Sequence, residues 1–262
     1  MSLARRLFTA GGAPLQPDQV EWTTPGTYSF DVPAVGDGVW DYDVHFISAV
    51  VIGAGGIGSS SSPFPGGAGG GLHWRNEVPV TPGETLTVVV GLGAANGGVS
   101  QIKRGSTVLL EATGGFTLGN PGKGRFDLYG GGGGWGGSCP GGVGNGGLGG
   151  GAAGYVGNGG SAGNLYGPAG NYPATDSGGG RGGNTQTPGN GRINRKGEGV
   201  GLQGRTPDKA YGSLGAVKCG AGNPNVGIDG SSPGPDQHGG ARIMWGRNEF
   251  GPRSYPDNAW DV

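Results

Sequence analysis

Apolar and polar residues alternate along two short segments in the first half of the chain. Residues 27–33 (TYSFDVP) and 81–93 (TPGETLTVVVGLG) both place apolar side chains at every second position. Alternation of this kind is typical of a strand with one buried face. The Pro82-Gly83 pair in the second segment predicts a turn before its strand. The alternating apolar positions are Tyr28, Phe30, Val32, Leu86, Val88 and Val90.

Three further segments carry strand patterns. Residues 39–53 (VWDYDVHFISAVVIG) alternate at first and then become continuously apolar, which predicts a strand covered on both faces. Residues 99–115 predict a hairpin that turns at KRGS, and residues 241–245 (ARIMW) predict a last strand. The stretch HWRNEVPVTPGE, residues 73–84, is interpreted as a loop that enters a new strand. The early alternation in residues 39–53 runs through Trp40, Tyr42, Val44 and Phe46.

The apolar residues are unevenly distributed and scarce. Leu, Ile, Val and Phe make up less than one fifth of the chain, whereas glycine accounts for 69 of 262 residues. Apolar residues are dense over residues 20–118, sparse over 119–240, and return at 241–245. We therefore expect a small β core with a long glycine-rich segment inserted before its last strand.

Glycine recurs with a local period of three inside the inserted segment. Polyproline II has three residues per turn, so glycine at every third position gives a rod with one bare face. Bare faces let rods approach closely, and their main-chain groups must then pair between rods. We expect a polyproline II (polyglycine II-like) helix bundle that needs few apolar side chains. The two frames are Gly141, Gly144, Gly147 and Gly150, and then Gly151, Gly154, Gly157, Gly160 and Gly163.

The predicted fold class is all-β, without substantial α-helix. It consists of a small antiparallel β-sandwich and the glycine-rich polyproline II bundle. The expected organisation is a docking arm at 1–19, a sandwich base at 20–118 plus 241–250, the bundle at 119–240, and a tail at 251–262.

Charge and cysteine content narrow the possible functions. The formal net charge is −1, which argues against a nucleic-acid surface. Cys139 and Cys219 are too few for a disulfide framework or a zinc site, and could either pair or remain buried thiols. The longest apolar run, FISAVVI, is short for a membrane span, and residues 1–14 lack the apolar stretch of a signal peptide. We expect synthesis in the cytoplasm.

One motif suggests a cofactor but lacks the required context. Gly53, Gly55 and Gly58 match the dinucleotide fingerprint G-x-G-x-x-G, which needs a helix to follow. Four serines and two prolines, within residues 59–65, follow instead, and such a segment does not form a helix. We expect no cofactor and no enzymatic activity. His45, His73 and His238 have no Cys or carboxylate neighbours at metal-ligand spacing, so we expect no metal site.

Aromatic residues embedded in glycine, asparagine, serine and proline are the candidate recognition residues. One interpretation is that each ring fills a gap between rods. The other is that they form a receptor-binding surface, since Tyr and Trp give contact area at low entropic cost. The candidates are Phe64, Trp135, Tyr155, Tyr166, Tyr172 and Tyr211.

Three segments carry a resemblance to known proteins: TPGTYSF (24–30), VTPGETLTV (80–88) and GGARIMWG (239–246). With the glycine-rich tract, they resemble the glycine-rich domain of bacteriophage tail fibres and adhesins. The ending, residues 239–256, is similar to the closing stretch of phage virion structural proteins. The resemblance implies a virion location, a β base and glycine-rich loops that display variable surfaces, and it supplies no catalytic residues.

The sequence therefore predicts a virion structural protein, a tail-fibre or tip adhesin. Its partners would be a host surface glycan or outer-membrane protein and, through Leu3, Leu7 and Phe8 of the arm, another virion protein. Homo-oligomerisation is left open. The alternatives are a capsid-decorating or head-fibre protein, and an ice-binding protein, although the chain lacks a repeated Thr or Ala ladder.

Overall fold

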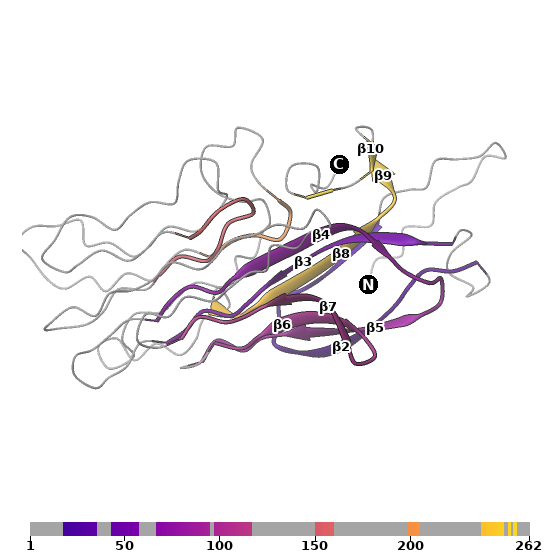
Figure 1. The fold of residues 1–262 in the computed structure, drawn as a ribbon. Coiled ribbons are helices and arrows are strands. Elements are labelled where there is room, and N and C mark those ends of the chain that lie inside the picture. Colours follow the sequence, from indigo (N-terminus) through magenta and orange to yellow (C-terminus); the bar gives the residue numbers. More distant parts are fainter. Residues whose placement is uncertain are drawn as a thin grey trace, which may run out of the picture.

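The fold consists of two facing β-sheets, seen in a computed structural model (Figure 1). The structure describes residues 18–35, 43–57, 67–94, 97–116, 150–159, 199–204, 237–248, 251–252 and 254–255. No α-helix is present in these ranges. The strands are β1 (Asp18–Trp22), β2 (Gly26–Asp31), β3 (Phe46–Ile52), β4 (Leu72–Pro79), β5 (Thr85–Val90), β6 (Ser100–Arg104), β7 (Thr107–Ala112), β8 (Gly240–Trp245), β9 (Arg247–Asn248) and β10 (Gly251–Pro252).

The two large sheets are four-stranded and antiparallel, which confirms the predicted sandwich. Their strand orders are β1-β8-β3-β4 and β2-β5-β6-β7, and β9 and β10 form a separate ribbon. Strand β8, which follows the glycine-rich insertion in sequence, lies between β1 and β3. The chain therefore returns from the insertion into the middle of a sheet. The ARIMW pattern predicted this strand but not its position in the sheet.

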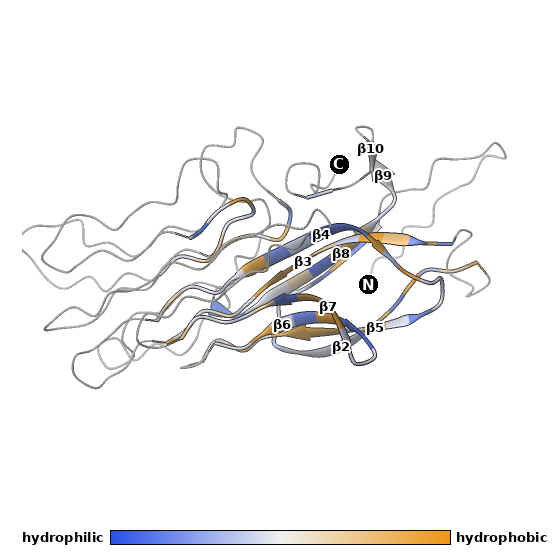
Figure 2. Ribbon diagram, in the orientation of Figure 1, coloured by the Kyte–Doolittle hydropathy of each residue, from blue (hydrophilic) through white to orange (hydrophobic). Residues whose placement is uncertain are grey.

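The alternating segments bury their apolar faces between the sheets. Phe30, Leu86, Val88 and Ile102 lie in a single apolar cluster with side chains of β3, β7 and β8. Figure 2 shows hydrophobic stretches on strands of both sheets. Phe46 departs from the prediction, because its side chain is 59% exposed. The inward positions of β3 begin instead at Ile47, so the alternation shifts phase as this strand starts.

Strand β3 is covered on both faces, as its continuous apolar run predicted. Ala49 and Val51 face the cluster between the sheets, whereas Val50 and Ile52 belong to a second cluster on the outer side. The second cluster is completed by residues 150–159 and 199–204, which we call the outer layer. Where the outer layer covers the β1-β8-β3-β4 sheet, the protein therefore has three layers: the two sheets and the outer layer.

Strand β4 contradicts the interpretation of residues 73–84 as a loop. Residues 72–79 pair with β3, and Leu72, His73 and Val78 are buried. The register shifts by one residue between Ile47 and Ala49 of β3, which is a β-bulge. Glu77 takes a left-handed φ of 50° there. The polar residues at the bulge interrupt the alternation of apolar and polar positions, so the sequence pattern does not indicate a strand here. Strand β1 also begins earlier than the predicted boundary, at Asp18.

Candidate functional site

Six strands of the sandwich run into glycine-rich segments at the same end of the molecule. The ends concerned are those of β3, β5 and β7 and the starts of β4, β6 and β8, on the left of Figure 1. We call this region the glycine end. Its described residues are 53–57, 67–71, 91–94, 97–98, 113–116 and 237–239. None of these residues is Asp, Glu, Lys or Arg.

Main-chain hydrogen bonds in the glycine end repeat every third residue. Two amides three positions apart in one segment donate to carbonyls three positions apart in the same neighbouring segment. A strand would instead direct such bonds to two sides in alternation, so the pattern is that of a threefold extended chain. The bonds are Gly53 N to Gly71 O (2.9 Å), Gly56 N to Ala68 O (2.9 Å), Ala68 N to Phe116 O (3.2 Å), Gly71 N to Thr113 O (3.0 Å), Gly150 N to Gly67 O (2.9 Å) and Ala153 N to Gly70 O (2.9 Å).

The segment after β3 lies at the centre of this network. Its remaining amides point to three other segments: Ala54 donates to Gly98 (3.0 Å), Gly55 to Gln237 (2.8 Å) and Ile57 to Ala94 (3.0 Å). Main-chain pairing among glycine-lined segments was expected for residues 119–240. Here it occurs in the loops of the sandwich itself. Most of the insertion lies outside the described residues, so the bundle there stays a prediction.

Close approach explains why glycine is required at particular positions. A Cβ atom on Gly67 would lie 1.9 Å from the Gly56 carbonyl oxygen, and one on Gly70 would lie 1.9 Å from that of Gly53. Gly53, the first residue of the G-x-G-x-x-G match, has the Thr113 oxygen 2.1 Å from the same position. These glycines let backbones pack against one another. In residues 53–57, no helix begins after β3.

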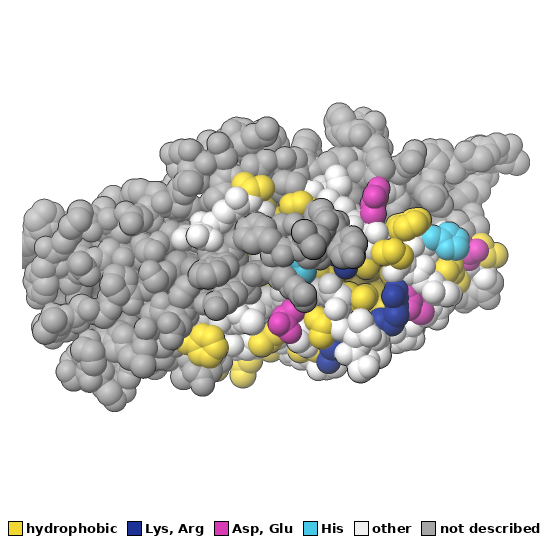
Figure 3. All heavy atoms as spheres, in the orientation of Figure 1, with side chains coloured by type: hydrophobic (Ala, Val, Ile, Leu, Met, Phe, Trp, Pro, Cys, Tyr) yellow, Lys and Arg dark blue, Asp and Glu magenta, His cyan; other side chains and the backbone are white. Residues whose placement is uncertain are grey.

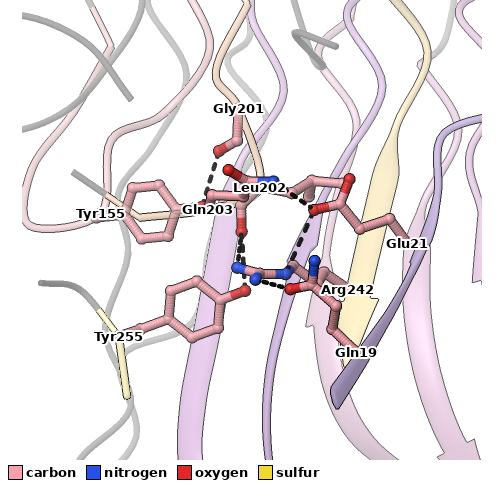
Figure 4. Close-up of polar contacts among 8 residues, drawn as sticks. All are labelled: Gln19, Glu21, Tyr155, Gly201, Leu202, Gln203, Arg242 and Tyr255. Atoms are coloured by element: carbon pink, nitrogen blue, oxygen red, sulfur yellow. Dashed lines mark hydrogen bonds and ion pairs between the residues drawn. The ribbon is translucent and has the colours of Figure 1, made fainter. Parts of the chain in front are cut away.

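Two tyrosines hold the outer layer against the sheet, as Figure 4 shows. The rings of Tyr155 and Tyr255 stack with their centroids 5.4 Å apart and 11° between their planes. The Tyr155 hydroxyl donates to the Gly201 carbonyl and the Tyr255 hydroxyl to the Leu202 carbonyl, each at 2.8 Å. Both rings are buried. The two hydroxyls thus bind adjacent main-chain carbonyls of the outer layer.

Arg242 adds a buried charge to the same place. It lies on β8, its side chain is fully buried, and its Nη1 donates to the Leu202 carbonyl at 3.3 Å. Glu21 on β1 lies directly opposite in the register and forms an ion pair with Arg242 Nε at 3.3 Å. Gln19 accepts a hydrogen bond from Nη2. These contacts offset part of the cost of burying the guanidinium.

Strand β4 contributes two further side chains to this site. The Asn76 side chain both donates to the Tyr255 carbonyl and accepts from the Tyr255 amide, each at 2.8 Å. Trp74 Nε1 donates to the Tyr155 carbonyl at 2.7 Å, and its ring lies 6.5 Å from that of Tyr255. We call these five residues, Trp74, Asn76, Tyr155, Arg242 and Tyr255, the clasp. The bulge in β4 places Asn76 where it pairs with the C-terminal segment.

The structure removes one residue from the predicted recognition surface. Tyr155 has no exposed area, so its ring is unavailable to a receptor and instead fills space between segments. That was the alternative interpretation of these aromatics. The remaining predicted recognition and docking residues lie outside the described part of the chain, as do both cysteines. They are Phe64, Trp135, Tyr166, Tyr172, Tyr211, Leu3, Leu7 and Phe8.

Sequence reasoning missed most of the clasp. Arg242 could have been recognised, because a charged residue inside the apolar run ARIMW indicates a buried charge that needs partners. Tyr255 and Asn76 carry none, since their partners lie 179 residues away in the chain.

The described residues contain no group of three or more His, Cys, Asp or Glu side chains that could hold a metal ion. On the face shown in Figure 3, acidic and basic side chains are interspersed among apolar and neutral ones. Within the same ranges, no helix is long and apolar enough to cross a membrane. No protein-family model matches the chain, and no curated protein matches it significantly.

Proposed function

We propose that this chain is a bacteriophage virion structural protein, a tail-fibre or tip adhesin that binds a host surface receptor through the glycine end. The observation that carries the proposal is the convergence of the long connections on one side of the fold. Residues 58–66 and 117–149 have flanking residues in the glycine end or in the outer layer bonded to it. The same holds for 160–198 and 205–236. Binding loops grouped on a rigid β scaffold are a common arrangement for recognition.

The surface of the glycine end supports a contact role. It carries no charged residue among its described positions, and two of its apolar side chains are exposed. Leu92 is 55% exposed and Phe116 is 40% exposed, and Val156 in the adjoining outer layer is 45% exposed. Exposed apolar side chains also occur elsewhere, at Val35 and Phe46, so the absence of charge among the described positions is what distinguishes the glycine end. The receptor would be a surface glycan or an outer-membrane protein.

The opposite end of the sandwich suits attachment to the particle. Asp18 pairs with Trp245, at the far end of β8 from the glycine end, whereas Trp22 pairs with Ala241 near it. Asp18, the first described residue, therefore lies at the end of the sandwich away from the proposed receptor surface, and residues 1–17 precede it in the chain. This polarity fits an arm that docks to another virion protein through Leu3, Leu7 and Phe8.

Receptor binding is tested with purified protein. The full chain should bind host cells and block infection, and the triple variant Trp135→Ala, Tyr166→Ala, Tyr172→Ala should lose both effects. Phe46→Ala is the matched control, because Phe46 is an exposed aromatic residue away from the glycine end. Equal loss in the control, or no binding by the unmodified protein, would overturn the adhesin proposal in favour of a decorating role.

The docking arm is tested by a deletion that stops before β1. Removing residues 1–17 keeps Gln19 and Glu21, which contact Arg242, so the sandwich should fold with an unchanged thermal midpoint. Incorporation into particles should be abolished. If the shortened protein still enters particles, the arm does not dock the protein.

A further inference from the structure

Within the described residues, the outer layer and the sandwich are joined by main-chain bonds, by the clasp and by apolar packing. Gly150 and Ala153 donate main-chain bonds to the glycine end, and the clasp contacts the face of the β1-β8-β3-β4 sheet. The layer itself contributes small apolar side chains and one leucine to the second cluster. These are Ala152, Ala153, Val200 and Leu202, together with Tyr155.

Tyr255 joins three parts of the molecule to the C-terminal segment. It pairs with Asn76 of β4 through its main chain, with Leu202 of the outer layer through its hydroxyl, and with Tyr155 through its ring. It follows β10, which pairs with β9 and with neither large sheet. Tyr255 can therefore leave its position without breaking a bond between strands of the sandwich.

Two opposing effects act on the docked layer. Opening it would expose apolar side chains such as Ile52 and Met244, which favours the closed state. Opening would also return the fully buried guanidinium of Arg242 to water, which favours the open state. Because these effects oppose each other, the bonds of Tyr255 make a large contribution to the free-energy difference between the closed and open states.

We propose that Tyr255 is a latch that keeps the outer layer docked, and that this layer opens as a unit of its own while the sandwich stays folded. The larger apolar cluster lies between the two sheets and is untouched by the opening. Local opening below the free energy of global unfolding is expected for a unit that packs on the smaller of the two apolar clusters. The proposal does not depend on the proposed function, since it concerns the free protein.

Amide hydrogen exchange on the full chain tests the latch. In Tyr255→Phe, which removes one buried hydrogen bond, amides of residues 150–159 and 199–204 should exchange about tenfold faster. Amides of β3 and β8 should keep their rates, because the sheet does not open. Tyr255→Ala, which also removes the stacked ring, should accelerate the outer layer further.

Tyr28→Phe provides the matched control. The Tyr28 hydroxyl also donates to a main-chain carbonyl at 2.8 Å, that of Thr24, but on β2 and away from the clasp. This variant should leave exchange in the outer layer unchanged.

Three results would overturn the proposal. One is an equal acceleration of β3 and β8 in Tyr255→Phe, which would mean that the layer and sandwich open together. The second is no acceleration of the outer layer in Tyr255→Ala. The third is exchange of the outer layer at unfolded-chain rates in the unmodified protein, which would mean that the layer is not docked.

Discussion

The interior of the sandwich and the glycine end are held together by different parts of the chain. Between the sheets, buried side chains such as Leu86 and Ile102 interlock, and the main chain is paired along strands. In the glycine end, main chains pack directly against main chains, with amide–carbonyl distances near 2.9 Å and no room for a Cβ atom at Gly67 or Gly70. The first region is damaged by removing atoms, and the second by adding them.

The largest effect is expected from truncating a side chain between the sheets. Leu86 is fully buried, so Leu86→Ala should destabilise the protein by about 3–5 kcal/mol through lost burial and the cavity left behind. Chemical denaturation, with the midpoint and slope measured together, provides the value. Val108→Ala is the control, because Val108 is 38% exposed and should change stability little. Equal effects would mean that the inter-sheet cluster does not hold the fold.

Adding one methyl group should be almost as harmful in the glycine end. Gly70→Ala places a Cβ atom 1.9 Å from the Gly53 carbonyl oxygen, so the paired segments must separate, at a cost of about 2–3 kcal/mol. Gly105→Ala is the comparison, since nothing lies within 4 Å of its Cβ position and its cost of about 1 kcal/mol comes from its positive φ. If both variants lose the same stability, main-chain contact does not limit the glycine end.

A smaller effect is expected where the sheet meets the outer layer. Arg242→Met keeps most of the side-chain volume but removes bonds to Glu21, Gln19 and Leu202, which should cost about 1–2 kcal/mol. Glu21 is partly exposed and can be hydrated, and Leu202 keeps its bond from Tyr255, so the loss is limited. Thermal unfolding measures it. A gain in stability would show that the desolvation of the guanidinium outweighs its bonds.

The sequence predicted the sandwich because its strands follow simple rules. Leu86, Val88 and Val90 alternate, and a Pro-Gly pair precedes their strand; Gly83 takes φ of +78° in that turn. The double-sided burial of β3 was equally visible in its continuous apolar run. In these cases the neighbours that decide the structure lie in the same segment or in the adjoining turn.

Other features depended on contacts that are distant in the chain. Strand β4 was missed because its bulge places Asn76 and Glu77 in succession, which destroys the period of two. For Tyr155 the sequence left two interpretations open, a recognition residue or a ring that fills a gap. Its burial depends on Tyr255, one hundred positions later. The glycine composition predicted main-chain packing, but not that it begins in the loops of the sandwich.

The smallest effect is expected from an exposed ion pair at the end of the sandwich remote from the glycine end. Arg104 donates to both carboxylate oxygens of Glu84 at 2.7 Å and to the Pro79 carbonyl, and thereby joins the β6–β7 turn to the turn before β5. The hydrogen bond from Arg104 is the main cause that lowers the pKa of Glu84 below its ordinary value of 4.5, and the Thr81 amide adds to it.

Because the pKa of Glu84 is lower in the folded state, its stabilising effect is present above about pH 4.5 and is lost as the pH falls through the folded value. Glu84→Gln should therefore cost less than about 1 kcal/mol at pH 7, since the Arg104 side chain is 42% exposed. The difference from the unmodified protein should shrink in acid and at high salt. Thermal midpoints of both proteins at pH 7 and pH 3 measure it. A difference that is the same at both pH values would mean that the charge of Glu84 contributes nothing, and that shape alone joins the two turns.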